Sequence, residues 1–144
     1  MTNTNEELYD GGIRLIRGAD LSAETGQTAG AERLVAIGPN DDAKARSGRL
    51  WMGRVRNEPG MRSVPHHHGE AETAGYILSG NARISWGEGY EQYVDLETGD
   101  FCYVPAYLPH IEANLSETDP LVFLTCRTPD NIVINLEDTD LPAV

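Results

Sequence analysis

Three consecutive histidines, His66, His67 and His68, stand in a chain of 144 residues that has only four histidines. In a β-strand, residues i and i+2 face the same side, so His66 and His68 would point one way and His67 the other. Two imidazoles on one face are a suitable pair of metal ligands. The fourth histidine, His110, lies in FCYVPAYLPHIEAN, a strand with a proline-stiffened turn. If His110 folds beside the first pair, the three histidines can bind one metal ion through three nitrogens. Such a set leaves coordination positions of the metal open, as in catalytic metal sites.

The run of histidines alone does not establish a metal site, because three solvated histidines in a surface loop would give the same letters. A remnant of an affinity tag is disfavoured, since the run is short and internal. The wider spacing is more specific. Segments 60–80, GMRSVPHHHGEAETAGYILSG, and 99–114, GDFCYVPAYLPHIEAN, contain all four histidines between glycine, proline and asparagine residues at fixed intervals.

These two segments resemble the two motifs of the cupin superfamily, G-x5-H-x-H-x(3,4)-E-x6-G and G-x5-P-x-G-x2-H-x3-N. The resemblance implies an all-β fold, a single-domain cupin-type jelly-roll barrel that holds a metal ion inside. It implies His66, His68 and His110 as metal ligands, and a homodimer as the assembly.

Two positions depart from the motifs. Tyr107 stands where the second motif has glycine, which places a bulky ring near the mouth of the expected site. The motif glutamate has two candidate positions: counting from His68 reaches Glu72, whereas counting back from Gly80 reaches Thr73. Because neighbouring strand residues face opposite sides, the choices exclude each other without a bulge. We favour Thr73, with Glu72 as an alternative ligand or a residue beside the ligands.

The elements that would position these residues are short β-strands. From residue 49 onward, segments rich in Val, Ile, Tyr, Trp, Phe and Thr are interrupted every 8 to 12 residues by Gly, Pro, Asn or Asp, a pattern of sandwiches and barrels. We expect the barrel over 31–144 and an irregular N-terminal arm over 1–30, with one short strand at 13–18 and possible contact with a partner subunit. Expected core or wall residues are Trp51, Ile77, Leu78, Ile84, Val104, Leu121, Phe123 and Val133.

Composition restricts the partners. The net charge is −12 and Lys44 is the only lysine, so the chain would repel phosphate backbones and nucleic-acid binding is disfavoured. No apolar run approaches the roughly 20 residues of a membrane-spanning helix, and the N-terminus has no secretory pattern, so a cytoplasmic location is expected. Cys102 and Cys126 match no zinc-site spacing and are expected as buried free thiols.

The expected site suggests three functions. The first is a metal-dependent oxygenase for a small anionic chelating substrate, with Fe2+ favoured and Zn2+, Mn2+ or Ni2+ as alternatives. Tyr107 and Glu72 are candidate catalytic residues, and an arginine could hold the anion. The second is a metal-dependent isomerase, cyclase or lyase with Glu72 or His67 as general base. The third is a non-catalytic protein that binds a small molecule. The candidate arginines are Arg54, Arg56, Arg62 and Arg83.

Overall fold

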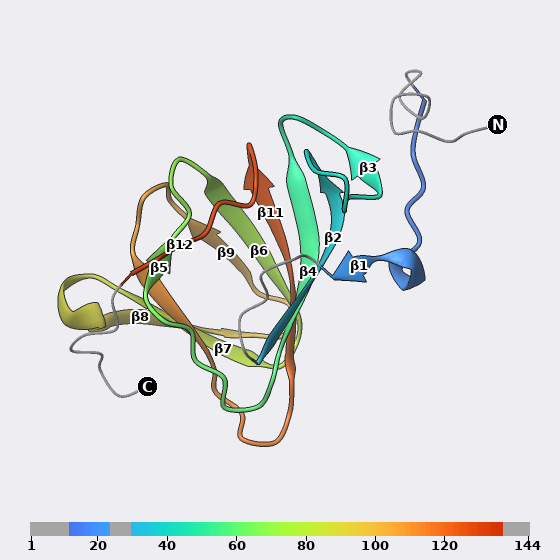
Figure 1. Ribbon diagram of the computed structural model, residues 1–144. Coiled ribbons are helices and arrows are strands. Elements are labelled where there is room, and N and C mark those ends of the chain that lie inside the picture. Colours follow the sequence, from blue (N-terminus) through green and yellow to red (C-terminus); the bar gives the residue numbers. More distant parts are fainter. Residues whose placement is uncertain (1–11, 24–29, 137–144) are drawn as a thin grey trace.

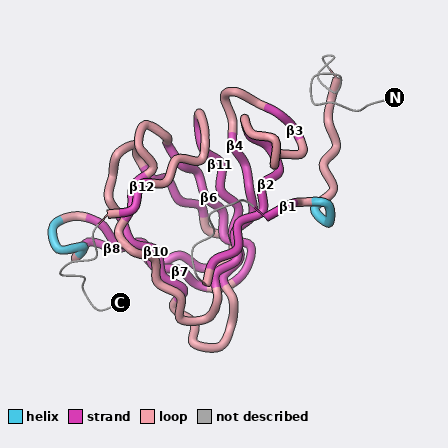
Figure 2. The backbone as a smooth tube through the Cα atoms, viewed as in Figure 1, coloured by secondary structure: helices cyan, strands magenta, loops and turns pink. Residues whose placement is uncertain are grey.

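The computed structural model describes residues 12–23 and 30–136 as an all-β fold of two sheets that face each other (Figure 1). Within the described residues, the only helical segments are two short 3₁₀ turns, η1 (Gly18–Asp20) and η2 (Glu88–Tyr90), as Figure 2 shows. The expected jelly-roll barrel is confirmed. None of the described segments is a helix of the length and apolar character needed to cross a membrane.

The larger sheet has seven strands and the smaller sheet has five. The larger sheet runs in the order β1 (Ser22–Ala23), β2 (Ala31–Gly38), β4 (Trp51–Asn57), β11 (Leu121–Thr128), β6 (Glu72–Ser79) and β9 (Phe101–Val104), with β3 (Ala45–Arg46) parallel to β2. The smaller sheet runs in the order β12 (Ile134–Asn135), β5 (His66–His67), β10 (His110–Asn114), β7 (Asn81–Trp86) and β8 (Gln92–Glu97).

The core lies between the sheets because every second strand residue points inward. Its largest cluster consists of Ile77, Ala82, Leu96 and Leu121, with Ile84, Cys102 and Phe123 packed against it. A second cluster under β2 and β4 contains Val35, Ala43 and Trp51. Both cysteines are free thiols, and burial raises the pKa of each. The core expectations for Leu78 and Val133 were wrong, since both side chains are exposed.

The motif residues that do not touch the site shape the backbone. Gly80 joins β6 to β7 at a φ of +98°, and a Cβ there would lie 2.8 Å from the Pro120 carbonyl oxygen, so the position favours glycine. Asn114 is buried, and its side-chain amide donates to the Glu58 and Asp119 carbonyl oxygens. This side chain therefore fixes the loops at one end of the barrel.

The N-terminal region differs from the expectation. Residues 12–17 form no strand, so the strand expected at 13–18 is wrong, and η1 and β1 follow instead. Ile13 and Leu15 are exposed, so the apolar side chains of this segment are not buried against a sheet. The remainder of the expected arm, residues 1–11 and 24–29, lies outside the described residues.

Candidate metal centre

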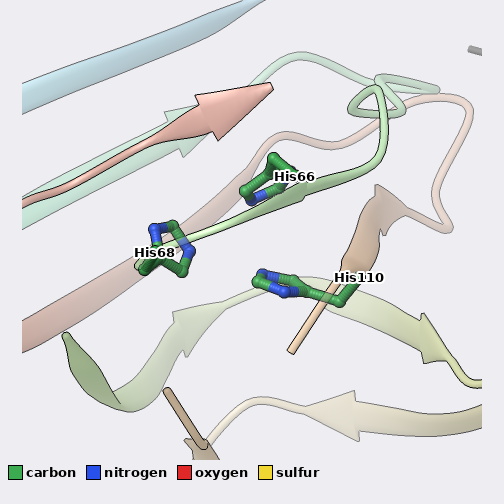
Figure 3. Close-up of side chains that lie close together, drawn as sticks. All are labelled: His66, His68 and His110. Carbon is green, nitrogen blue, oxygen red and sulfur yellow. The ribbon is translucent and has the colours of Figure 1, made fainter. Parts of the chain in front are cut away.

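Three histidine rings converge between the two sheets (Figure 3). His66 lies on β5, His68 follows directly after it, and His110 opens β10, where it pairs across the sheet with His66. The ring centroids are 4.4 to 5.1 Å apart, and one potential ligand atom from each ring lies within 4.8 Å of the others. All three side chains are buried. The arrangement brings together the three histidines expected from the motif spacing.

Each ring is oriented by a backbone carbonyl. Nδ1 of His66 lies 2.9 Å from the Val64 oxygen, and Nδ1 of His110 lies 2.8 Å from the Leu108 oxygen. Nδ1 of His68 lies 2.7 Å from the oxygen of Ile132, a residue 64 positions away. A carbonyl oxygen only accepts hydrogen bonds, so each Nδ1 carries the proton and each Nε2 presents its lone pair. This is the tautomer that a metal bound at Nε2 requires.

The environment keeps two of the rings neutral. Burial, followed by the nearby Arg127 charge, lowers the pKa of His68 to about 2. Burial and the neighbouring His66 lower the pKa of His110 to about 4. Neutral imidazoles are the form that binds metal, and three of them suit several divalent ions. The donor set therefore fits a divalent metal ion.

Arg127, on the inward face of β11, lies beside the histidines. Its guanidinium is buried and fixed at two points: Nε donates to Thr73 Oγ1 at 2.9 Å, and Nη1 donates to Asn131 Oδ1 at 2.7 Å. Nη2 lies 3.3 Å from Nε2 of His68. The guanidinium carbon is 5.6 Å from the centre of the Trp51 ring. A permanent positive charge is thus built into the wall of the site.

One carboxylate also lies near the centre. Glu112, two residues after His110 on β10, places Oε1 3.8 Å from Nε2 of His66. Its other oxygen accepts a hydrogen bond from Asn57 Nδ2 at 3.2 Å. Glu112 therefore brings a negative charge to the side of His66, whereas Arg127 brings a positive charge to the side of His68.

The centre opens into a small cavity, about 40 Å³, which has room for a few water-sized groups. His68, His110, Glu112 and Arg127 line its polar end. The apolar end is lined by Ile77, Ala82, Ile84, Leu96, Leu121 and Phe123. Cys102 and Val104 also border the adjoining pocket, whose wall includes Trp86, Phe101 and Tyr103 from β7 and β9. The two pockets also share Ile84, Leu96 and His110, so they adjoin beside the metal centre.

Strand facing decides between the two candidates for the motif glutamate. Thr73 is buried and lines the cavity, whereas Glu72 is exposed on the other side of β6 and accepts a hydrogen bond from the Tyr103 hydroxyl. The alternative of Glu72 as a ligand or a general base at the centre is therefore not supported. Thr73 occupies the position that faces the metal site, as the count back from Gly80 indicates.

Tyr107 and His67 also lie away from the cavity. Tyr107 is 65% exposed, and its ring is 6.3 Å from that of His67. His67 faces away from the other histidines, and its Nδ1 accepts a hydrogen bond from the Gly69 N–H. Neither side chain lines the cavity between the sheets, so the catalytic role expected for Tyr107 and the base role expected for His67 lack structural support. The φ of Tyr107 is +61°, which explains physically why glycine suits this motif position.

Sequence reasoning missed Arg127 and Glu112, and also Thr125, which lines the same cavity. The four arginines singled out lie elsewhere along the barrel; Arg83, for example, pairs with Asp95 and Arg56 pairs with Glu58 at the surface. A signal was present in LVFLTCRT, where Arg127 is two and four residues beyond Thr125 and Phe123. Period-two alternation puts Arg127 on the same inward face as the expected core residue Phe123.

Comparison with known proteins agrees with this architecture. The sequence model of the cupin domain matches residues 53–126. Among solved structures, KdgF from Halomonas sp. superposes with a TM-score of 0.64 at 16% identity, covering 82% of this chain and 94% of that chain. Oxalate decarboxylase OxdC from Bacillus subtilis gives 0.63 at 24% identity, covering 76% of this chain and 28% of that chain.

This chain therefore spans less than a third of the decarboxylase, an enzyme with Mn(II) centres. At such identities the likeness to both solved proteins establishes the fold. No curated protein sequence matches the chain.

Proposed function

Because this chain belongs to the cupin domain family, with a three-histidine centre that fits a divalent metal, we propose that it is a metal-dependent oxygenase. The proposed metal is Fe2+ and the proposed substrate is a small anionic molecule that can chelate it. The observation that carries this proposal is the charge of the site. Imidazole ligands carry no charge, so three of them would leave the double charge of the metal intact. Thr73, which lines the cavity, stands where the motif has glutamate.

Arg127 strengthens the same argument. Its buried guanidinium adds a positive charge on the side of His68, so the polar end of the cavity attracts an anion. When bound, Fe2+ would supply Lewis-acid chemistry and a means to bring dioxygen to the substrate. His66, His68 and His110 would hold the metal through Nε2, and Arg127 would orient a carboxylate or enolate. The small cavity restricts the substrate to a few atoms beyond its chelating group.

Oxygen consumption tests this proposal. Protein purified without a histidine tag is loaded anaerobically with Fe2+ and mixed with 2-oxo acids, β-diketones and catechols. Oxygen uptake that equals substrate loss, and that disappears in His110→Ala, is the expected result. Turnover that proceeds at the same rate without oxygen would contradict an oxygenase.

An oxygen-independent isomerase or lyase is the second candidate, and Glu112 favours it. A carboxylate 3.8 Å from His66 Nε2 lies where a proton acceptor would face a bound substrate. OxdC, which shares the fold, is described as a decarboxylase with Mn(II) centres and not as an oxygenase. Product formation under anaerobic conditions by the Mn2+- or Zn2+-loaded protein, abolished in Glu112→Gln, would support this candidate. Ligand binding without turnover under either condition would leave a binding protein.

A further inference from the structure

The guanidinium of Arg127 contacts Nε2 of His68, the atom through which this histidine would bind a metal ion. Because Nδ1 of His68 donates to the Ile132 carbonyl, Nε2 has one lone pair, and in this structure that lone pair faces Arg127 Nη2 at 3.3 Å. A metal ion bound through Nε2 needs the same lone pair. The guanidinium and the metal therefore compete for one atom, and metal binding requires Nη2 to turn away from His68.

The guanidinium cannot move far when it turns. Thr73 and Asn131 hold its other nitrogens, and Trp51 lies beneath it. Two positive groups, the metal and the guanidinium, must then remain close together in a buried site, where their repulsion is strong. An anion placed between them would offset this repulsion. It would also accept the hydrogen bond from Arg127 Nη2 that His68 no longer accepts.

Thr125 supplies a second contact for such an anion. It lies two residues before Arg127 on the inward face of β11 and lines the same cavity. Its hydroxyl is buried, and among the described residues Oγ1 has no hydrogen-bond partner. A buried hydroxyl without a partner is unfavourable, and a carboxylate oxygen would satisfy it.

We propose that Arg127 couples metal binding to carboxylate binding: a carboxylate held by Arg127 and Thr125 draws the guanidinium from His68 and so increases the affinity for the metal. The inference rests on the proposed metal centre and extends it, because it identifies the substrate's anionic group and its contacts. The coupling is reciprocal, so the metal also increases the affinity for the carboxylate by the same factor.

The test measures Zn2+ affinity by competition with a chromophoric chelator, with and without propionate, a monocarboxylate that chelates metal weakly. Propionamide serves as the neutral control. We expect propionate to tighten Zn2+ binding roughly tenfold, within the usual range of coupled sites, and propionamide to leave it unchanged. Isothermal titration calorimetry of the wild type measures propionate binding directly, and this binding should tighten by the same factor when Zn2+ is present.

Three variants assign the effect. Arg127→Met removes the competitor, so it should bind Zn2+ at least as tightly as the wild type without propionate and lose the response to propionate. Thr125→Val keeps the shape of the side chain; it should weaken the response and leave the Zn2+ affinity without propionate unchanged. Arg56→Met, at an exposed arginine paired with Glu58, should behave as the wild type.

The outcomes separate this inference from the proposed function. Wild-type protein that binds Zn2+ equally with and without propionate overturns the coupling and leaves the metal centre intact. A propionate effect that persists in Thr125→Val and Arg127→Met overturns the assignment of the residues. Absence of Zn2+ binding overturns the metal centre itself. If Arg127→Met does not fold, the wild type and Thr125→Val decide the matter.

Discussion

At the scale of single residues, the centre is preorganised by carbonyl oxygens and not by carboxylates. Three backbone carbonyls, those of Val64, Leu108 and Ile132, fix the Nδ1 protons of the histidines. A neutral partner orients a ring without adding negative charge, so the metal keeps more of its own charge than it would with carboxylate partners. The centre is consequently suited to anionic ligands.

Removal of one histidine should abolish tight metal binding. We expect His110→Ala to lower the affinity for Zn2+ or Mn2+ by about 100-fold or more, because it removes one of three ligands, a larger loss than that caused by altering a residue beside a ligand. Glu72→Ala is the matched control, since Glu72 is exposed and bonded to Tyr103. Equal loss of metal from both variants, measured by elemental analysis after dialysis, would contradict the three-histidine set.

The buried histidines should make the metal-free protein sensitive to mild acid. Unfolded histidine takes up a proton near pH 6.5, whereas burial lowers the pKa of folded His110 to about 4 and of His68 to about 2. The unfolded state therefore binds more protons below pH 6.5, and folding stability falls as the pH decreases. Each ring should reduce stability by roughly 2 kcal/mol between pH 7.5 and 5.

Thermal melting of chelator-treated protein at pH 7.5 and pH 5 measures this effect. The melting temperature should fall on acidification, and it should fall less in His110→Gln, which has no titrating ring. An equal change in the wild type and in His110→Gln would show that other groups cause the acid sensitivity.

At the scale of elements, β4 contributes the aromatic ring that packs beside Arg127. Trp51 is fully buried and lies over Gly53 on the inward face of the strand, with the Arg127 guanidinium above its ring. A Cβ at Gly53 would lie 2.5 Å from the Trp51 ring and 2.7 Å from the Leu34 carbonyl oxygen. The glycine thus leaves room for a large aromatic ring next to the charged group of the site.

Gly53→Ala should therefore destabilise the protein by about 1 to 3 kcal/mol, the usual range for overpacking. It should also weaken the response of Zn2+ binding to propionate, because a displaced Trp51 shifts Arg127. Gly48→Ala is the control, since a Cβ there meets no atom within 4 Å. Urea denaturation of both variants measures the difference, and equal stabilities would contradict the close packing of Trp51 on Gly53.

At the scale of the whole molecule, self-association must act against a net charge of −12. Several large apolar side chains among the described residues are exposed in the single chain. Ile13 and Leu15, in the segment that precedes η1, are two of them (Figure 1). The homodimer implied by the family resemblance stays a prediction, and these residues are where the arm would contact a partner subunit.

Light scattering tests the assembly. We expect a mass of twice 15.8 kDa at physiological salt, and dissociation at low salt, where repulsion between the two negative chains is less screened. Replacing both Ile13 and Leu15 by serine should shift the equilibrium toward the monomer. Tyr93→Ser, at an exposed position on β8, is the control. A wild-type mass of 15.8 kDa at all concentrations would contradict the dimer.

The sequence by itself determined the features that depend on neighbours along the chain. Strand alternation placed His66 and His68 on one face, and the distance to Gly80 selected Thr73 over Glu72, because the two-residue period is a local property of extended backbone. The turn residues and β-branched segments indicated the all-β barrel for the same reason.

Tertiary structure alone decided which distant residues surround the histidines. Arg127 reaches His68 across 59 positions, and Asn57 reaches Glu112 across 55, so both contacts depend on the order of strands in the two sheets. The charge of the site, the tautomer of His68 and the size of the cavity follow from that order. Each arises from side chains that meet only when non-neighbouring strands pair. The pattern along one segment indicates which side chains face inward, as it does for Arg127, but not which strands become neighbours.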